Sequence, residues 1–191
     1  MTLRPLTAIY DANVLYPAPL RDLLVRLAHA GLVRARWTDT IHDEWIRNVC
    51  RNNPGLAPER LARTRILMND AVRDCLVAGH EHLIDTLSLP DADDRHVLAA
   101  AIHASADVIV TFNLRDFPES ALSEFGIQAQ HPDEFVGNVL SHSCGAVCAI
   151  LNRQRACLRN PPIEPDELLN TLEKQGLPES VSKLRQFRNL L

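Results

Sequence analysis

The feature that most constrains the fold is the short segment at 107–111, Asp-Val-Ile-Val-Thr. It is β-branched and apolar on both faces, which is typical of a central parallel strand, because helices cover such a strand on both sides. Further short strands are predicted at 7–10, 33–38 and 127–129, with helical patterns between them. This order predicts an α/β fold, a three-layer α/β/α arrangement with a central parallel sheet.

The chain is predicted to divide into an α/β domain at 1–140 and a C-terminal helical extension at 141–191. Three short helices are predicted in the extension, at 146–158, 166–174 and 178–190. Helices of this size hold no core of their own, so they must pack on the domain or on another chain.

Composition is that of an ordinary soluble globule, with 46% hydrophobic and 23% charged residues. No apolar run is expected to reach the length of a membrane span, and the start of the chain lacks the layout of a signal peptide. We therefore expect a cytoplasmic protein with no membrane partner. The net charge of −4 does not by itself indicate nucleic-acid binding. Acids gathered at a metal site would, however, be neutralised by the ion.

Acidic residues gather at the start of the helix that precedes segment 107–111. Asp91, Asp93 and Asp94 follow Pro90, and apolar residues then recur at helical spacing. Carboxylates stabilise a helix N-terminus because the free N–H groups and the helix dipole favour negative charge. Capping alone would therefore account for these three residues.

Oxygen-bearing side chains also follow the strand at 107–111. Thr111, Asn113 and Asp116 lie at its C-terminal end, where ligands bind in open α/β sheets. A turn at Asn113 and an ordinary loop aspartate would be the alternative without a ligand. Together with the acids of the preceding helix, these side chains would suit Mg²⁺ or Mn²⁺, which prefer oxygen ligands.

Two further acids lie far upstream. Asp11 follows the first predicted strand, where a buried carboxylate needs hydrogen-bond partners or a cation. It could also cap a helix that begins at once. Glu44 flanks Trp45 at the edge of the apolar face of a helix at 40–49, where it could serve as a ligand or lie in solvent.

These four regions, in this order, resemble the signatures of the PIN-domain ribonucleases. Asp-Ala-Asn-Val-Leu at 11–15 corresponds to the family's first signature, and Glu44 to its glutamate. Asp94, before an alanine-rich helix, corresponds to the third acid, with Asp91 as an alternative in the same turn. Thr-Phe-Asn-Leu-Arg-Asp-Phe at 111–117 corresponds to the closing pattern.

The resemblance implies a PIN-like fold and an endoribonuclease that hydrolyses RNA phosphodiester bonds with Mg²⁺ or Mn²⁺. It implies that the catalytic and metal-binding residues are Asp11, Glu44, Asp94 and Asp116, and that the supporting residues are Asn13, Asp91, Thr111 and Asn113. Asn113 is neutral where the commonest form of the family is acidic. Either Asp116 supplies that charge or a second ion binds weakly.

Within the family, the sequence is most similar to VapC-type toxins of bacterial toxin–antitoxin pairs, in a branch with an extra C-terminal helical region. This resemblance implies an RNA substrate and a cognate antitoxin, and we expect a homodimer. The extension could bind the antitoxin, cover the active cleft or build the dimer.

Two other classes of protein remain open. A degenerate PIN fold would bind RNA or a protein without cutting. A phosphatase of the haloacid-dehalogenase type needs an aspartate two residues after Asp11, where this chain has Asn13. His42, His96 and His103 are expected to be ordinary core or surface residues and not ligands, because Mg²⁺ prefers oxygen.

Overall fold

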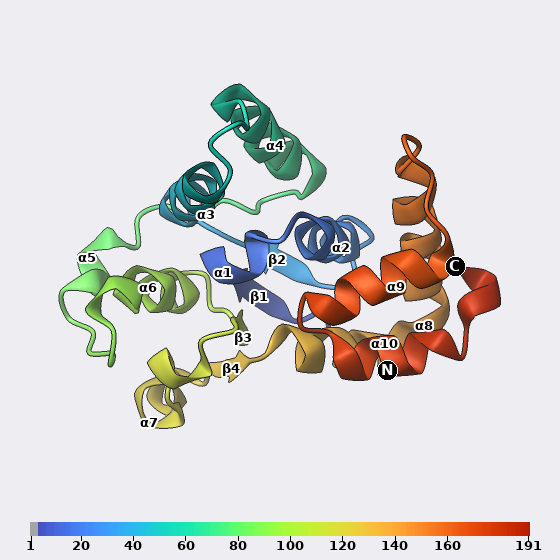
Figure 1. The fold of residues 1–191 in the computed structure, drawn as a ribbon. Coiled ribbons are helices and arrows are strands. Elements are labelled where there is room, and N and C mark those ends of the chain that lie inside the picture. Colours follow the sequence, from blue (N-terminus) through green and yellow to red (C-terminus); the bar gives the residue numbers. More distant parts are fainter. Residues whose placement is uncertain (1–3) are drawn as a thin grey trace.

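The computed structural model describes residues 4–191, so residues 1–3, at the start of the segment that is predicted not to be a signal peptide, lie outside it. Its centre is a parallel sheet in the order β2-β1-β3-β4 (Figure 1). The strands are β1 (Thr7–Tyr10), β2 (Arg34–Arg36), β3 (Val108–Val110) and β4 (Gln128–Gln130). The predicted α/β fold with a central parallel sheet is confirmed.

Helices surround this sheet, with α3 and α4 to one side of it and α8 and α10 to the other (Figure 1). The helices are α1 (Ala12–Leu15), α2 (Ala18–His29), α3 (Asp39–Asn52), α4 (Pro58–Ala71), α5 (Glu81–Ile84), α6 (Arg95–His103), α7 (Glu119–Leu122), α8 (Pro132–Cys157), α9 (Pro165–Lys174) and α10 (Pro178–Arg185). Short 3-10 turns are η1 (Ala92–Asp94), η2 (Leu114–Asp116), η3 (Ser123–Phe125) and η4 (Arg188–Leu190).

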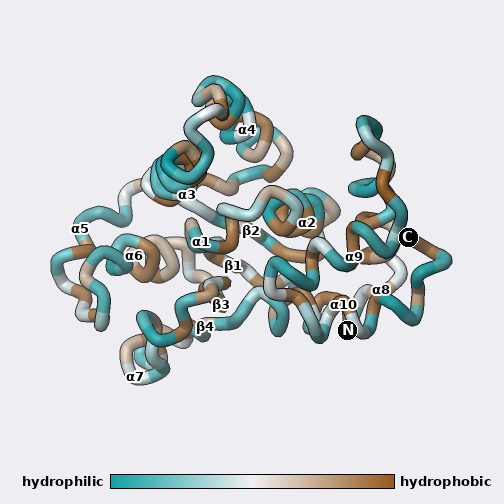
Figure 2. Tube along the Cα trace, viewed as in Figure 1, coloured by the Kyte–Doolittle hydropathy of each residue, from teal (hydrophilic) through white to brown (hydrophobic). Residues whose placement is uncertain are grey.

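The two central strands form the middle of the core. Ile9 of β1 pairs with Ile109 of β3, and both side chains are fully buried. Burial of an aliphatic side chain of this size contributes about 1.5–3 kcal/mol. In Figure 2 the outer turns of α3 are largely hydrophilic. Segment 107–111 is therefore apolar on both faces because helices cover both sides of the sheet.

Apolar residues at helical spacing predict one helix over 58–77, but α4 ends at Ala71, where the chain turns away. Asp74 has a φ of 55°, which is incompatible with a continuing right-handed helix. Beyond it the backbone pairs with Trp37, which donates its N–H to the carbonyl of Cys75 (2.9 Å) and accepts one from Val77 (2.9 Å). Pairing at the edge of the sheet prevails there over the helical pattern.

The eighth helix crosses the predicted boundary between residues 140 and 141. It runs from Pro132 to Cys157 and departs from helical geometry at Ser143, with φ −146° and ψ 41°. The extension therefore begins as the continuation of a helix that is already packed on the sheet. The division into 1–140 and 141–191 stays a prediction.

The C-terminal helices share the core of the α/β domain. Buried leucines of α9 and α10, among them Leu172 and Leu184, belong to the same apolar cluster as the sheet. Asp133 of α8, itself buried, caps α10: its carboxylate accepts the N–H groups of Glu179 (2.8 Å) and Ser180 (2.8 Å). The extension thus packs on the domain of its own chain.

By length and composition alone, α8 passes the test for a membrane span, so the prediction that no stretch reaches that length is wrong. Of its apolar window, 44% is buried inside the protein. A core helix passes the same test when its apolar residues face the rest of the fold.

A glycine between α9 and α10 brings the extension against the end of β3. Gly176 has a φ of +92°, and a Cβ atom there would lie 2.7 Å from Cε1 of Phe112. We expect Gly176→Ala to lower the free energy of unfolding by about 1–3 kcal/mol, because of backbone strain and this overlap. Urea unfolding measures the change. Gly55→Ala, where a Cβ meets no atom of residues 4–191 within 4 Å, is the control. Equal losses in the two variants would contradict the role of this overlap.

Candidate active site

Adjacent parallel strands bring together residues a hundred positions apart. Tyr10 of β1 lies opposite Val110 of β3, so Asp11 and Thr111 leave the sheet side by side. The backbone N–H of Asp11 donates to the carbonyl of Val110 (3.1 Å), and that of Thr111 donates to the carbonyl of Gln130 (3.0 Å). The C-terminal edge of the sheet therefore holds both side chains at fixed positions.

The carboxylate of Asp11 is buried, with 5% of the residue exposed. Its Oδ1 accepts the N–H of Ala12 (2.6 Å), and its Oδ2 accepts Nδ2 of Asn13 (2.6 Å) and Oγ1 of Thr111 (2.7 Å). Asp11 thus both ends β1 and caps α1. A carboxylate has about four lone-pair sites, so three donors leave one free on Oδ1. Burial raises the pKa of Asp11, against the Thr111 and Ala12 hydrogen bonds, which lower it.

The hydroxyl of Thr111 is fully buried and uses its whole hydrogen-bonding capacity. It donates to Asp11 and accepts Nδ2 of Asn13 (2.9 Å) and the N–H of Asn113 (3.0 Å). Oδ1 of Asn13 in turn accepts the N–H of Phe112 (3.1 Å). These bonds join the first turn of α1 to the segment after β3 and hold the Asp11 carboxylate in one orientation.

Removal of this hydroxyl tests the network. We expect Thr111→Val to lower the free energy of unfolding by about 1–3 kcal/mol, because the buried carboxylate of Asp11 loses a donor and the N–H of Asn113 loses its acceptor. Denaturant unfolding at neutral pH measures the change. Thr111→Ser keeps the hydroxyl, so it should keep most of the stability that Thr111→Val loses. A serine variant as unstable as the valine variant would show that packing of the methyl group matters more than the hydrogen bonds.

Asp94 lies at the start of α6, and no hydrogen bond to its carboxylate is found within residues 4–191. Its pKa is raised from the ordinary 3.8 to about 7, first by burial and then by the negative charges of Asp11, Asp91 and Asp116, while His96 opposes the shift. These carboxylates therefore act on one another electrostatically. The structure brings four of the acids singled out in the sequence into one neighbourhood.

The other candidates differ in how their side chains are used. Asp91 is exposed and caps η1, with Oδ1 accepting the N–H of Asp93 (2.9 Å). Asp116 is half-buried in η2, whereas Asn113, just before it, is exposed and its side chain caps nothing. Asp91 therefore has a local structural task, while Asp116 contributes its charge to the neighbourhood of Asp94.

Glu44 enters the same region from α3. Its Oε1 lies 3.0 Å from Nε2 of His96, a residue of α6 that is 8% exposed. Within the described chain neither ring nitrogen of His96 has a hydrogen-bond partner, so this contact lacks hydrogen-bond geometry. His96 therefore differs from the expected core histidine in having no hydrogen-bond partner within the described chain. The signal in the sequence that His96 lies near the site is its position two residues after Asp94, a candidate ligand.

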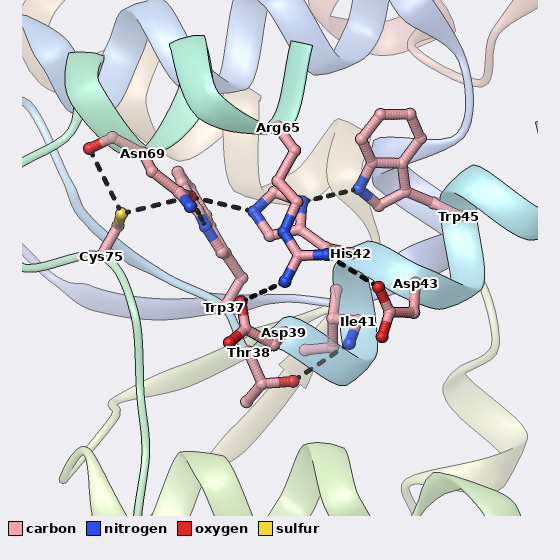
Figure 3. Close-up of polar contacts among 10 residues, drawn as sticks. All are labelled: Trp37, Thr38, Asp39, Ile41, His42, Asp43, Trp45, Arg65, Asn69 and Cys75. Carbon is pink, nitrogen blue, oxygen red and sulfur yellow. Dashed lines mark hydrogen bonds and ion pairs between the residues drawn. The ribbon is translucent and has the colours of Figure 1, made fainter. Parts of the chain in front are cut away.

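A buried polar network holds α3, and with it Glu44, against α4 (Figure 3). Nε1 of Trp45 donates to Nδ1 of His42 (3.0 Å), so the other ring nitrogen, Nε2, carries the hydrogen and donates to Oδ1 of Asn69 (2.9 Å). The same oxygen accepts Nε1 of Trp37 (2.9 Å). His42 is a satisfied core residue, as expected, and its bonds restrict rotation of the helix that carries Glu44.

The acids are not neutralised by neighbouring arginines. Among residues 4–191, the ion pairs of arginine involve Asp22, Asp39, Asp43, Asp107, Asp166 and Glu173, and none of the candidate site residues. In the same part of the chain, no three His, Cys, Asp or Glu side chains form a ready-made metal cage. An oxygen-rich donor set with free lone pairs still fits a divalent cation.

A cavity of about 760 Å³ borders this edge of the sheet. It lies between the α1–α2 connection, the end of α3 and the turn between α9 and α10. Its lining includes Tyr16, Asn53, Phe112, Lys174 and Gln175. The C-terminal extension therefore forms one wall of this cavity. Phe112, the residue after Thr111, forms part of another.

Comparison with known proteins agrees with this architecture. Residues 7–115 match the PIN domain, and residues 132–186 match the VapC50 C-terminal domain. A Mycobacterium tuberculosis (strain ATCC 25618 / H37Rv) protein named "Putative ribonuclease VapC50" is 41% identical over 94 residues, which are 49% of this chain and 55% of that protein. The match thus spans about half the length of this relative. No solved structure is detectably similar. The chain therefore belongs to the PIN domain family, and its C-terminal part matches the VapC50 C-terminal domain.

Proposed function

We propose that this protein is an endoribonuclease that hydrolyses RNA phosphodiester bonds with Mg²⁺ or Mn²⁺. The observation that carries the proposal is the gathering of carboxylates at the C-terminal edge of the sheet. Asp11 is buried there with one lone pair free, and Asp91 and Asp116 lie close enough to Asp94 for their charges to help raise its pKa. Such a concentration of negative charge is unfavourable unless a cation is bound. A bound divalent ion would activate water and stabilise charge on the leaving oxygen.

The proposed ligands are Asp11, Glu44, Asp94 and Asp116. Asp94 is preferred to Asp91, because the carboxylate of Asp91 is engaged in capping η1. Asp116 is preferred to Asn113, because Asp116 carries the charge that acts on Asp94. Thr111 and Asn13 would orient Asp11, and the backbone of Asn113 would orient Thr111.

The test is incubation of the full-length chain with a mixed RNA pool, followed by sequencing of the RNA 5′ ends. Defined new ends in the presence of Mg²⁺ or Mn²⁺, and none with EDTA, are the expected result. Single-stranded DNA of matched sequence is the control for use of the 2′-hydroxyl. RNA that is retained on the protein but stays intact with either metal would favour the alternative, a degenerate PIN fold that only binds.

We further propose that the protein is the toxin of a VapBC-type pair in the cytoplasm, with a cognate antitoxin and a homodimeric state. Support comes from the similarity to a VapC50 protein and its C-terminal domain. Induction of the chain in its host should stop growth, and co-expression of the antitoxin should restore it. Light scattering of the purified chain measures the oligomeric state. Unaffected growth at high expression would contradict the toxin role.

The cavity beside Phe112 suggests where the RNA backbone lies. Lys174 lines it, whereas Lys183, the other lysine of the chain, does not. We expect Lys174→Ala to weaken RNA binding several-fold. The slope of the logarithm of the RNA association constant against the logarithm of the salt concentration should fall in magnitude by about one, as for one lost phosphate contact. Fluorescence anisotropy at several salt concentrations measures both. Lys183→Ala should leave the slope unchanged; an equal effect would indicate general attraction to the protein surface.

A further inference from the structure

We infer that His96 supplies a nitrogen ligand beside Glu44, so that the site favours a first-row transition metal ion such as Mn²⁺ over Mg²⁺. The inference rests on the proposed function and narrows it to one class of cofactor. His96 is added to the four proposed carboxylate ligands, which supply only oxygen.

The first support is the state of the imidazole. His96 is more than nine-tenths buried, and within the described chain both ring nitrogens lack hydrogen-bond partners. A buried polar group without a partner is destabilising, because it has given up its hydrogen bonds to water and gained none in the protein. Buried groups of this kind are uncommon in folded proteins, and a bound water molecule or ion can satisfy them.

The second support is the contact with Glu44. Nε2 of His96 and Oε1 of Glu44 lie 3.0 Å apart, yet the contact does not have the geometry of a hydrogen bond. With a hydrogen on Nε2, the pair leaves that hydrogen badly aimed. Without it, two electron-rich atoms lie 3.0 Å apart with no hydrogen between them. A cation that accepts both lone pairs satisfies the two atoms at once.

The distance between Nε2 of His96 and Oε1 of Glu44 also fits two ligands of one metal ion. Two neighbouring ligands of an octahedral ion with bonds of about 2.1 Å lie about 3.0 Å apart. The observed separation of 3.0 Å matches this edge. The pair also lies near the other acids, because the charge of His96 acts on both Asp11 and Asp94, and that of Glu44 acts on Asp11.

An imidazole ligand changes the preferred metal. Mg²⁺ favours oxygen and keeps several waters, whereas first-row transition metal ions also accept imidazole nitrogen. Loss of His96 should therefore affect the two ions differently. Water replaces the ring nitrogen on Mg²⁺ with little loss, while Mn²⁺ loses a favoured ligand.

The test uses the full-length protein with Mn²⁺ or Mg²⁺ alone and no RNA. We expect His96→Asn to weaken Mn²⁺ binding by about 10–100-fold and Mg²⁺ binding by less than about threefold, measured by calorimetry. Electron spin echo modulation of bound Mn²⁺ should show coupling to ¹⁴N of an imidazole in the unchanged protein and none in the variant. His103→Asn, at the exposed far end of the same helix, is the matched control and should change neither readout.

The outcomes separate this inference from the proposed function. Two results would show that His96 merely positions Glu44. One is Mn²⁺ binding to the unchanged protein without a ¹⁴N signal, and the other is an equal loss of affinity for Mn²⁺ and Mg²⁺ in His96→Asn. The inference then fails while the nuclease proposal stands. If neither ion binds the unchanged protein, the metal-dependent function fails as well. Should His96→Asn fail to fold, His96→Gln, with a side chain of similar reach, gives the same readouts.

Discussion

Asp11→Asn should reduce cleavage of RNA by about 1,000-fold or more, because it removes the charge of a carboxylate proposed to hold the metal. The folded state should survive the change. Asp11 is buried, and burial raises its pKa, so loss of its charge relieves a cost that offsets the loss of one accepting oxygen. Initial rates on a defined RNA with saturating Mn²⁺ measure the effect, and the melting temperature in EDTA reports the fold.

The matched control for this prediction is Asp70→Asn. Asp70 is an exposed aspartate on α4 outside the proposed ligand set, and its loss should leave the cleavage rate within about twofold. A rate for Asp11→Asn within tenfold of that of the unchanged protein would remove Asp11 from the proposed metal ligands. A loss of activity accompanied by a collapse of the melting temperature would show that Asp11 is needed to hold the fold.

Asp94→Asn should stabilise the metal-free protein at high pH. Above pH 3.8 an unfolded chain has lost the proton of Asp94, whereas the folded chain keeps it up to about pH 7. The free energy of unfolding therefore falls as the pH rises through this window. The full shift corresponds to about 4 kcal/mol, which solvent screening of the half-exposed carboxylate reduces to about 1–2 kcal/mol. The variant does not incur this loss.

Denaturant unfolding in EDTA at pH 4 and pH 8 measures this linkage. The variant and the unchanged protein should be equally stable at pH 4, and the variant should be more stable at pH 8. Saturating Mn²⁺ at pH 8 should reverse that order, because only the unchanged protein has a charged ligand at this position. Asp93→Asn, an exposed acid of the same turn, is the control. A profile for Asp94→Asn that parallels that of the unchanged protein would contradict the raised pKa.

The amino-acid sequence by itself determined the parallel sheet and the identity of the acids at its edge. A run that is apolar on both faces, such as 107–111, is stable only as a covered central strand, and the side chains that follow it must then lie at the C-terminal edge. That Asp11 meets Thr111 follows from the same rule once β1 and β3 are neighbours. Periodicity and strand ends are local properties, so they are visible without coordinates.

Tertiary structure alone decided how each side chain is used. Asp91 and Asp94 lie in one turn, yet only the three-dimensional arrangement shows that one caps η1 and the other faces three carboxylates. The sequence could not predict the state of His96, because the absence of a hydrogen-bond partner depends on α3 and α6 together. The continuation of α8 past residue 140, and the packing of α9 and α10 on the domain, depend on contacts between distant parts of the chain. Such contacts leave no periodic trace in the sequence.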